Sequence, residues 1–134
     1  MPDHPPAPTA LIVDDDPWVR APLHALLDTL GFEVREAVDG ESAIAALRAA
    51  PDAYAFVLLD VRLPRLGCDE VLAGLLGARR DLPVLLHTGF DQWQLPPALF
   101  AAGRVGYLGK PAGLAELVAA LQRLQVEVPL PVVA

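Results

Sequence analysis

Residues 11–16 read Leu-Ile-Val-Asp-Asp-Asp, an apolar run that ends in three carboxylates, and residues 56–60 read Phe-Val-Leu-Leu-Asp, which ends in a fourth. Short continuous apolar runs that stop at polar residues are typical of strands buried on both faces of a sheet. The carboxyl ends of parallel strands lie at one edge of their sheet, where such folds bind ligands. The two runs therefore predict that Asp14, Asp15 and Asp60 lie together at this edge.

The rest of the chain alternates between short apolar runs and longer stretches with helical spacing. Gly31 is suited to end the first helix, because glycine is the common residue just beyond a helix end. Alternating strands and helices predict an α/β fold, a doubly wound sheet of five parallel strands with helices on both faces. Strands are predicted at residues 10–13, 32–38, 53–60, 83–88 and 105–108, and helices at about 19–30, 40–49, 68–79, 97–102 and 114–125.

Two other predicted strands end in polar side chains, the hydroxyl of Thr88 and the ammonium of Lys110. Three carboxylates in one small site repel each other, and a divalent cation relieves that repulsion. Mg²⁺ prefers oxygen ligands and retains several waters, which favours Asp15 and Asp60 as direct ligands and Asp14 as a ligand through water. Mn²⁺ is a suitable substitute for Mg²⁺.

Asp60 alone ends the third strand, so it is the predicted nucleophile that attacks phosphorus and forms an acyl phosphate. Lys110 is predicted to pair with one phosphoryl oxygen, and the hydroxyl of Thr88 to donate to another. These four strand ends therefore predict a metal-assisted phosphoryl-transfer site whose catalytic residues are Asp60, Lys110 and Thr88.

The composition excludes several other classes of function. The 134 residues carry 10 Lys plus Arg against 17 Asp plus Glu, a net charge of −7, and no basic stripe that would favour nucleic acid. Every apolar run is shorter than the roughly 20 residues of a membrane span. Cys68 is the only cysteine, which excludes an internal disulfide, and the three histidines lack the spacing of a zinc site. We predict a soluble cytoplasmic domain with no nucleic-acid or membrane partner.

The two ends of the chain differ from its middle in composition. Residues 1–8 are rich in proline and lack the features of a signal peptide, so a disordered arm is predicted there. Residues 9–125 form the predicted domain. Residues 126–134 are apolar and contain Pro129 and Pro131, which end the last helix. This tail is expected either to pack back on the domain or to meet a partner.

The chain resembles the receiver domain of two-component response regulators, of the single-domain chemotaxis type, over about residues 9–125. The spacings between the matching segments also agree with the family. Those segments are Val13-Asp14-Asp15, Leu58-Leu59-Asp60, Leu63-Pro64, His87-Thr88-Gly89, Gly106-Tyr107 and Lys110-Pro111.

The resemblance implies a flavodoxin-like sheet with strand order 2-1-3-4-5 and a signalling switch rather than an enzyme. A sensor histidine kinase or histidine phosphotransfer protein would phosphorylate Asp60 in a Mg²⁺-dependent reaction, and this chain would assist only its own phosphorylation and dephosphorylation. Thr88 and Tyr107 would be the switch residues. The backbone carbonyl of Arg62 would be the third protein ligand of the metal, and a cis peptide would join Lys110 to Pro111.

The same resemblance implies that the output is altered partner binding in trans. The surface involved would be formed by the fourth helix, fifth strand and fifth helix, a face also suited to a homodimer. The downstream target, the kinase and the signal stay open.

Several residues depart from the family pattern. Cys68 stands where a glycine is usual. Arg62 and Phe90 form a bulky pair beside the predicted pocket mouth, so we expect slow access of water and a long-lived phosphoryl group. Pro96 and Pro97 are expected to shorten the fourth helix, because proline is tolerated only in the first turn.

Two alternative functions remain open at this level. A scaffold that keeps the receiver fold without phosphorylation is consistent with the departures from the family pattern. An acid-nucleophile phosphatase of the haloacid-dehalogenase type matches the Asp-x-Asp spacing of residues 14–16, yet the chain lacks an acidic pair after Lys110.

Some residues near the motifs have simpler explanations. Asp16 is predicted to cap the first helix, and His87 to pack on the strand face opposite Thr88. Trp93 and Phe100 flank the fourth helix and are candidates for an exposed patch.

Overall fold

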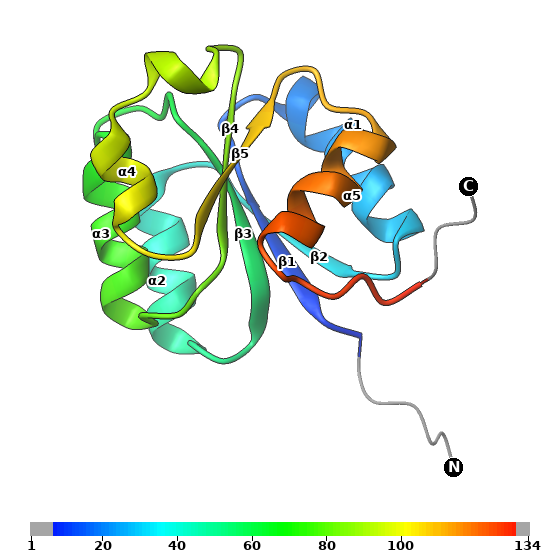
Figure 1. Ribbon diagram of the computed structural model, residues 1–134. Helices are drawn as coiled ribbons and strands as arrows, with labels where there is room; N and C mark the ends of the chain where they lie inside the picture. Colours follow the sequence, from blue (N-terminus) through cyan, green and yellow to red (C-terminus); the bar gives the residue numbers. More distant parts are fainter. Residues whose placement is uncertain (1–6, 131–134) are drawn as a thin grey trace.

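A computed structural model describes residues 7–130, which form a five-stranded parallel sheet of order β2-β1-β3-β4-β5 (Figure 1). This arrangement confirms the predicted fold class and strand order. The elements are β1 (Thr9–Val13), α1 (Pro17–Thr29), β2 (Glu33–Ala37), α2 (Gly40–Ala49), β3 (Tyr54–Asp60), α3 (Cys68–Ala78), β4 (Val84–Thr88), the 3₁₀ turn η1 (Gln92–Gln94), α4 (Pro97–Ala101), β5 (Val105–Gly109) and α5 (Leu114–Arg123).

Helices cover both faces of the sheet. Figure 1 shows α1 and α5 on one face and α2, α3 and α4 on the other. Successive strand residues point to opposite faces, so Leu11 and Val13 join the core beneath α2 and α3, whereas Ala10 and Ile12 join the core beneath α1 and α5. The central strands are therefore apolar throughout because both of their faces are buried.

Strand register brings the predicted site residues to one edge. Val13, the last residue of β1, pairs with Leu59 of β3, so Asp14 and Asp60 follow at the same level. Asp60 pairs in turn with His87 of β4, and Thr88 pairs with Gly109, which precedes Lys110. Four strand ends separated in sequence thus meet beside one another.

Two elements differ from a regular doubly wound domain. β2 is an edge strand in which Glu33, Arg35 and Glu36 are exposed, so it lacks the apolar faces expected of a buried strand. Charges on an edge strand oppose pairing with other chains. α4 has only five residues, which confirms that Pro96 and Pro97 shorten it; the 3₁₀ turn η1 precedes it.

The C-terminal segment packs back on the domain as far as residue 130. Val126 is buried and Val128 packs beside it, both against the core beneath α1 and α5. The amide of Leu130 donates to the carbonyl of Leu30 at 3.0 Å. Gly31 takes a positive φ of 93° just beyond α1, as predicted for a helix end. The first of the two expectations for the tail is therefore confirmed for residues 126–130.

Residues 1–6 and 131–134 lie outside the described residues, and most of the predicted arm falls there. Pro8 already belongs to the domain edge, because its carbonyl accepts a hydrogen bond from the amide of Glu33 at 2.9 Å. The division of the chain into arm, domain and tail stays a prediction. Within residues 7–130, none of the helices has the length and apolar character needed to cross a bilayer.

Close packing of α2 on α3 generates a stability prediction. A Cβ added at Gly74 would lie 2.8 Å from Cγ1 of Ile44, a stiff β-branched side chain, whereas a Cβ at Gly77 would meet nothing within 4 Å. Gly74→Ala is therefore expected to lower the free energy of unfolding by about 1–3 kcal/mol through overpacking. Gly77→Ala, its matched control in α3, should raise it by up to about 1 kcal/mol because alanine favours helix.

Urea unfolding of the two variants measures both effects. Equal changes of the same sign at Gly74 and Gly77 would contradict this account of the packing.

Candidate phosphoacceptor site

The three predicted carboxylates meet at the sheet edge. Asp14 follows β1 and is 1% exposed, Asp60 ends β3 and is 6% exposed, and Asp15 is exposed. One carboxylate oxygen from each lies within 4.8 Å of the others. Carboxylates this close raise each other's energy unless a cation or a proton compensates them. Their all-oxygen character fits a hard cation such as Mg²⁺.

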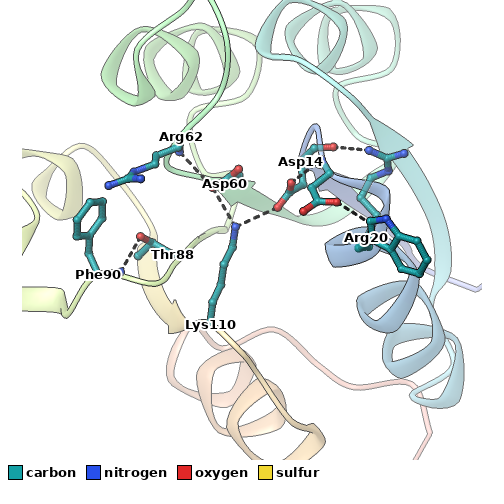
Figure 2. Close-up of polar contacts among 9 residues, drawn as sticks. Asp14, Arg20, Asp60, Arg62, Thr88, Phe90 and Lys110 are labelled. Carbon is teal, nitrogen blue, oxygen red and sulfur yellow. Dashed lines mark hydrogen bonds and ion pairs between the residues drawn. The ribbon is translucent and has the colours of Figure 1, made fainter.

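Lys110 supplies one positive charge directly to this cluster. Its Nζ lies 3.2 Å from Oδ2 of Asp14 and 3.2 Å from Oδ1 of Asp60. Figure 2 draws both contacts. The amide of Lys110 donates to the carbonyl of Thr88 at 2.7 Å, which anchors the residue to β4. Burial alone would lower the pKa of Lys110, but Asp60 and Asp14 outweigh it and raise that pKa, so the side chain stays charged.

The surroundings of Asp60 disfavour the ionised form of its carboxyl group. Burial raises the pKa of its carboxyl above the ordinary value, and the nearby charge of Asp14 adds to this effect. The amide of Arg62, which donates to Oδ1 at 3.1 Å, and the ammonium of Lys110 act in the opposite direction. The balance leaves a carboxylate that further positive charge would stabilise.

The loop between β1 and α1 is fixed by its own hydrogen bonds. Oδ1 of Asp14 accepts from the amide of Asp16 at 2.9 Å. Oδ1 of Asp16 accepts from the amide of Trp18 at 2.9 Å, which confirms Asp16 as the cap of α1. Asp16 therefore acts on the helix, and its side chain stabilises the turn that presents the acid pair.

Arg20 is a contributor that the sequence did not reveal. Its guanidinium donates from Nη1 to the carbonyl of Asp14 at 2.7 Å, a contact drawn in Figure 2. Its Nε donates to Glu36 at 2.6 Å, and Nδ1 of His24 also lies 2.7 Å from Glu36. The hydrogen bond from His24 and the charge of Arg20 lower the pKa of Glu36. Arginines near the start of a helix are common and usually form surface ion pairs. Nothing in the sequence therefore marked Arg20 as a residue that contacts Asp14.

Thr88 and Tyr107 are connected through the backbone of Phe90. The buried Oγ1 of Thr88 accepts from the amide of Phe90 at 3.0 Å, which leaves the hydroxyl proton of Thr88 free to be donated elsewhere. The hydroxyl of Tyr107 donates to the carbonyl of Phe90 at 2.6 Å. One residue thus joins the two predicted switch side chains.

The mouth of the cleft is partly covered by a stack of two side chains. Cζ of Arg62 lies 4.4 Å from the centre of the Phe90 ring, a cation–π contact visible in Figure 2. Both residues line the cleft together with Thr88 and Gly89. The expected bulky pair is therefore in contact, whereas the role of the Arg62 carbonyl as a metal ligand stays a prediction.

Two other residues near the site do not belong to its cluster of carboxylates and donors. His87 is buried on β4 behind the cleft, as predicted, and burial lowers its pKa to about 4. Cys68 begins α3, and burial together with Asp69 and Asp60 raises the pKa of its thiol to about 11. The thiol is therefore protonated and unreactive at neutral pH. The peptide between Lys110 and Pro111 is cis, as expected.

Comparison with known proteins shows to which family the chain belongs. Residues 10–122 match the model of the response regulator receiver domain. The chain belongs to this family. Its curated relatives include the transcriptional regulatory protein QseB of Haemophilus influenzae, 39% identical over 85% of this chain and 51% of QseB. Response regulator MprA of Mycobacterium tuberculosis is 40% identical over 85% of this chain and 49% of MprA. The chain spans about half the length of these relatives.

Solved structures of receiver domains are also similar. A putative response regulator from Chloroflexus aurantiacus superposes with a TM-score of 0.78 and 30% identity, over 90% of this chain and 99% of that one. The receiver domain of a sensor histidine kinase from Pseudomonas aeruginosa gives 0.75 and 29% over 88% and 97%, and its structure holds a magnesium ion in the active-site cleft. Chemotaxis protein CheY4 of Vibrio cholerae gives 0.78 and 27% over 88% and 98%.

Family membership defines the general function. This receiver domain is a phosphorylation-accepting switch of two-component signalling, and receiver domains act as signalling switches rather than as classical enzymes. Receiver domains bind Mg²⁺ in the active site, and the acidic cluster of this chain fits such an ion.

Burial of His87 generates a prediction about pH. The folded domain keeps this imidazole neutral down to pH of about 4, whereas an unfolded histidine takes up a proton near pH 6.5. The unfolded state therefore binds more protons, and the free energy of unfolding should fall as pH drops from about 6.5 to 4, by on the order of 2–3 kcal/mol from this residue.

Denaturant unfolding at several pH values, with a chelator present, measures this loss. Asp60 has a raised pKa and acts in the opposite direction, so the informative quantity is the difference between the wild type and His87→Gln. The variant should show a shallower pH dependence, and equal slopes in the two proteins would exclude His87 as the cause.

Proposed function

We propose that Asp60 accepts a phosphoryl group from the phosphohistidine of a sensor kinase or histidine phosphotransfer protein, in a Mg²⁺-dependent reaction. The observation that carries the proposal is the position of Asp60, a buried carboxylate at the end of a central strand, within 3.2 Å of the Lys110 ammonium and beside two more carboxylates. A purely structural role does not account for this combination, because two buried acids and an exposed third against one lysine leave net negative charge in the site.

The two oxygens of Asp60 differ in their surroundings. Oδ1 accepts from both the Arg62 amide and the Lys110 ammonium. Oδ2 is therefore the oxygen proposed to attack phosphorus: the Oδ2–P bond forms as the N–P bond of the phosphohistidine breaks, and the electron pair returns to the imidazole. Asp15, Asp60, Asp14 and the Arg62 carbonyl are the residues proposed to hold Mg²⁺. The bound ion would neutralise charge on the phosphoryl oxygens.

Lys110 and Thr88 are the proposed hydrogen-bond donors to the phosphoryl oxygens. The Lys110 ammonium is close enough to turn from the carboxylates to a phosphoryl oxygen once the metal neutralises Asp14 and Asp15. The hydroxyl proton of Thr88 is free, so it can be donated to a second oxygen, at the cost of moving Oγ1 away from the Phe90 amide. The chemistry is thus proposed to be coupled to movement of the Phe90 segment.

That movement is the proposed switch. Phe90 also accepts the Tyr107 hydroxyl, so a shift of Thr88 alters the position of Tyr107 on β5. The surface of α4, β5 and α5 would change with it and would bind a protein partner or a second copy of the chain. Trp93 is 81% exposed beside this surface, and Phe100 lines a hollow with it. The net charge of −7 argues against direct nucleic-acid contact by this chain.

Phosphorylation itself is the first test. Incubation with acetyl phosphate and Mg²⁺ is expected to add one phosphoryl group, seen by intact-mass analysis. Asp60→Asn should abolish the gain, because an amide cannot form the acyl phosphate, and a chelator should abolish it too. Asp16→Asn is the matched control: asparagine still caps α1 through its side-chain oxygen and so keeps the turn that presents the acid pair, and this variant should still be phosphorylated.

Two different results would contradict the proposed role of Asp60. Phosphorylation that persists in Asp60→Asn would place the acceptor elsewhere. No gain with several donors, together with no binding of beryllofluoride, would favour the alternative of a phosphorylation-independent scaffold.

The stack of Arg62 on Phe90 predicts a long-lived phosphoryl group. Because the two side chains cover the mouth of the cleft, attacking water must displace them. Arg62→Ala and Phe90→Ala should each speed loss of phosphate several-fold, as expected for a contact worth about 0.5–2 kcal/mol. The double variant should be little faster than either single one, because one contact is lost in each case.

Arg65→Ala is the control for this experiment. Arg65 lies in the same loop but pairs with Asp39 and Glu41 instead of the ring. Rates of phosphate loss measured after removal of the donor compare all four variants. An effect of Arg65→Ala equal to that of Arg62→Ala would show that the loop, and not the stack, controls access.

A further inference from the structure

Asp14 is held at each of its polar groups. Its amide donates to the carbonyl of Ala37 at 3.1 Å. Its carboxylate accepts from the amide of Asp16 through Oδ1 at 2.9 Å and from the ammonium of Lys110 through Oδ2 at 3.2 Å. Its carbonyl accepts from Nη1 of Arg20 at 2.7 Å (Figure 2). Of these four contacts, the bond from Arg20 is the one that holds the peptide leading to the next residue.

That bond restricts the direction of the Asp15 side chain. The carbonyl of Asp14 and the amide of Asp15 belong to one planar peptide group. Holding the carbonyl therefore limits how the chain can turn between the two acids. Asp15 is exposed, and one of its carboxylate oxygens lies within 4.8 Å of oxygens from Asp14 and Asp60. The place of Asp15 in the acidic cluster thus depends on a bond to the backbone rather than on burial.

Arg20 is itself held in position. It lies one turn into α1, where its amide donates to the carbonyl of Asp16 at 3.1 Å, and helical side chains lean toward the N-terminus, here over the loop after β1. Its Nε donates to Oε1 of Glu36 at 2.6 Å, while Oε2 of Glu36 lies 2.7 Å from Nδ1 of His24. Glu36 pairs with Ile12 in the sheet. Arg20 therefore connects the loop to both α1 and β2.

Arg20 has two opposite effects on a cation bound by the acidic cluster. Its positive charge repels the cation, so loss of the charge alone would tighten binding. Its bond to the Asp14 carbonyl keeps the acid pair in place, so loss of the bond would weaken binding. The direction in which the affinity changes therefore separates positioning from charge.

We propose that Arg20 is a positioning residue for Mg²⁺, which keeps the Asp15 carboxylate beside those of Asp14 and Asp60 and so sets the affinity of the site. Arg20 acts through the Asp14–Asp15 peptide, and Glu36 holds Arg20 in the orientation that this requires. The inference rests on the proposed Mg²⁺ site. It does not rest on phosphoryl transfer, because the affinity is measured without a phosphodonor.

The test titrates MgCl₂ into the full unphosphorylated chain and follows ¹H–¹⁵N correlation spectra. Arg20→Met keeps the apolar stem without charge or donor, and it should bind Mg²⁺ about three- to tenfold more weakly than the wild type. Arg20→Lys keeps the charge but has one nitrogen for two acceptors, so its affinity should lie between the two. Arg35→Met removes an exposed arginine from β2 and should bind at least as tightly as the wild type.

A second readout separates positioning from a direct part in the reaction. The rate of phosphorylation by acetyl phosphate is measured against Mg²⁺ concentration. In Arg20→Met the midpoint should rise by the same factor as the dissociation constant, whereas the rate at saturating Mg²⁺ should stay within about twofold of the wild type. Loss of stability alone would not move the midpoint, because the spectra establish that each variant is folded.

Three results would overturn the inference. They are an affinity of Arg20→Met equal to or above that of the wild type, an equal loss of affinity in Arg35→Met, and wild-type affinity in Arg20→Lys, which decides the matter should Arg20→Met not fold. A wild type that binds no Mg²⁺ would overturn the proposed metal site together with this inference. Normal Mg²⁺ binding without phosphorylation would overturn the proposed function alone.

Discussion

The ion pairs of Lys110 with Asp14 and Asp60 are the interactions on which the rest of the site depends. They connect the carboxyl ends of three strands, β1, β3 and β5, whose side chains would otherwise leave two buried negative charges without compensation. One ammonium cannot neutralise three carboxylates, so the site keeps an excess of negative charge at the bottom of an open cleft. This residual charge explains why the domain is suited to take up a divalent cation and then a phosphoryl group.

The scaffold around this cluster restricts where movement can occur. Hydrogen bonds from Asp16 and Arg20 fix the loop that presents Asp14, and both contacts involve backbone atoms of α1 or of the loop itself. On the opposite side, the side chains of Thr88 and Tyr107 both hydrogen-bond to the backbone of Phe90, in a segment that continues through η1 into the short helix α4. The acid pair is thus held on a loop fixed by several hydrogen bonds, and the hydroxyl of Thr88 lies on the segment whose movement is the proposed switch.

Bulky side chains border two regions at the same edge of the sheet. Arg62 and Phe90 cover the cleft in front of the carboxylates, whereas Trp18 projects beside a second pocket behind them. The first feature is the proposed control on how water reaches the phosphoryl group, and the second leaves an apolar surface next to a buried imidazole. The two regions share the backbone of β4 and the residue Lys110, although their side chains point to different faces of the sheet.

Much of this molecule follows from sequence pattern alone. Apolar runs that end in Asp14 and Asp60 predicted the strands, their parallel pairing and the edge at which the acids meet, because a strand buried on both faces leaves a continuous apolar run. Pro96 and Pro97 predicted a short α4, since proline restricts the backbone locally. Contacts between distant segments followed from pattern only in part. The sequence contained no sign of the clamp of Arg20 on Asp14, placed Arg62 and Phe90 beside the cleft without showing that they stack, and left open whether residues 126–130 return to α1. Local pattern determines which backbone each segment adopts, whereas only the packing of segments against one another decides which side chains meet and which buried groups are left without a partner.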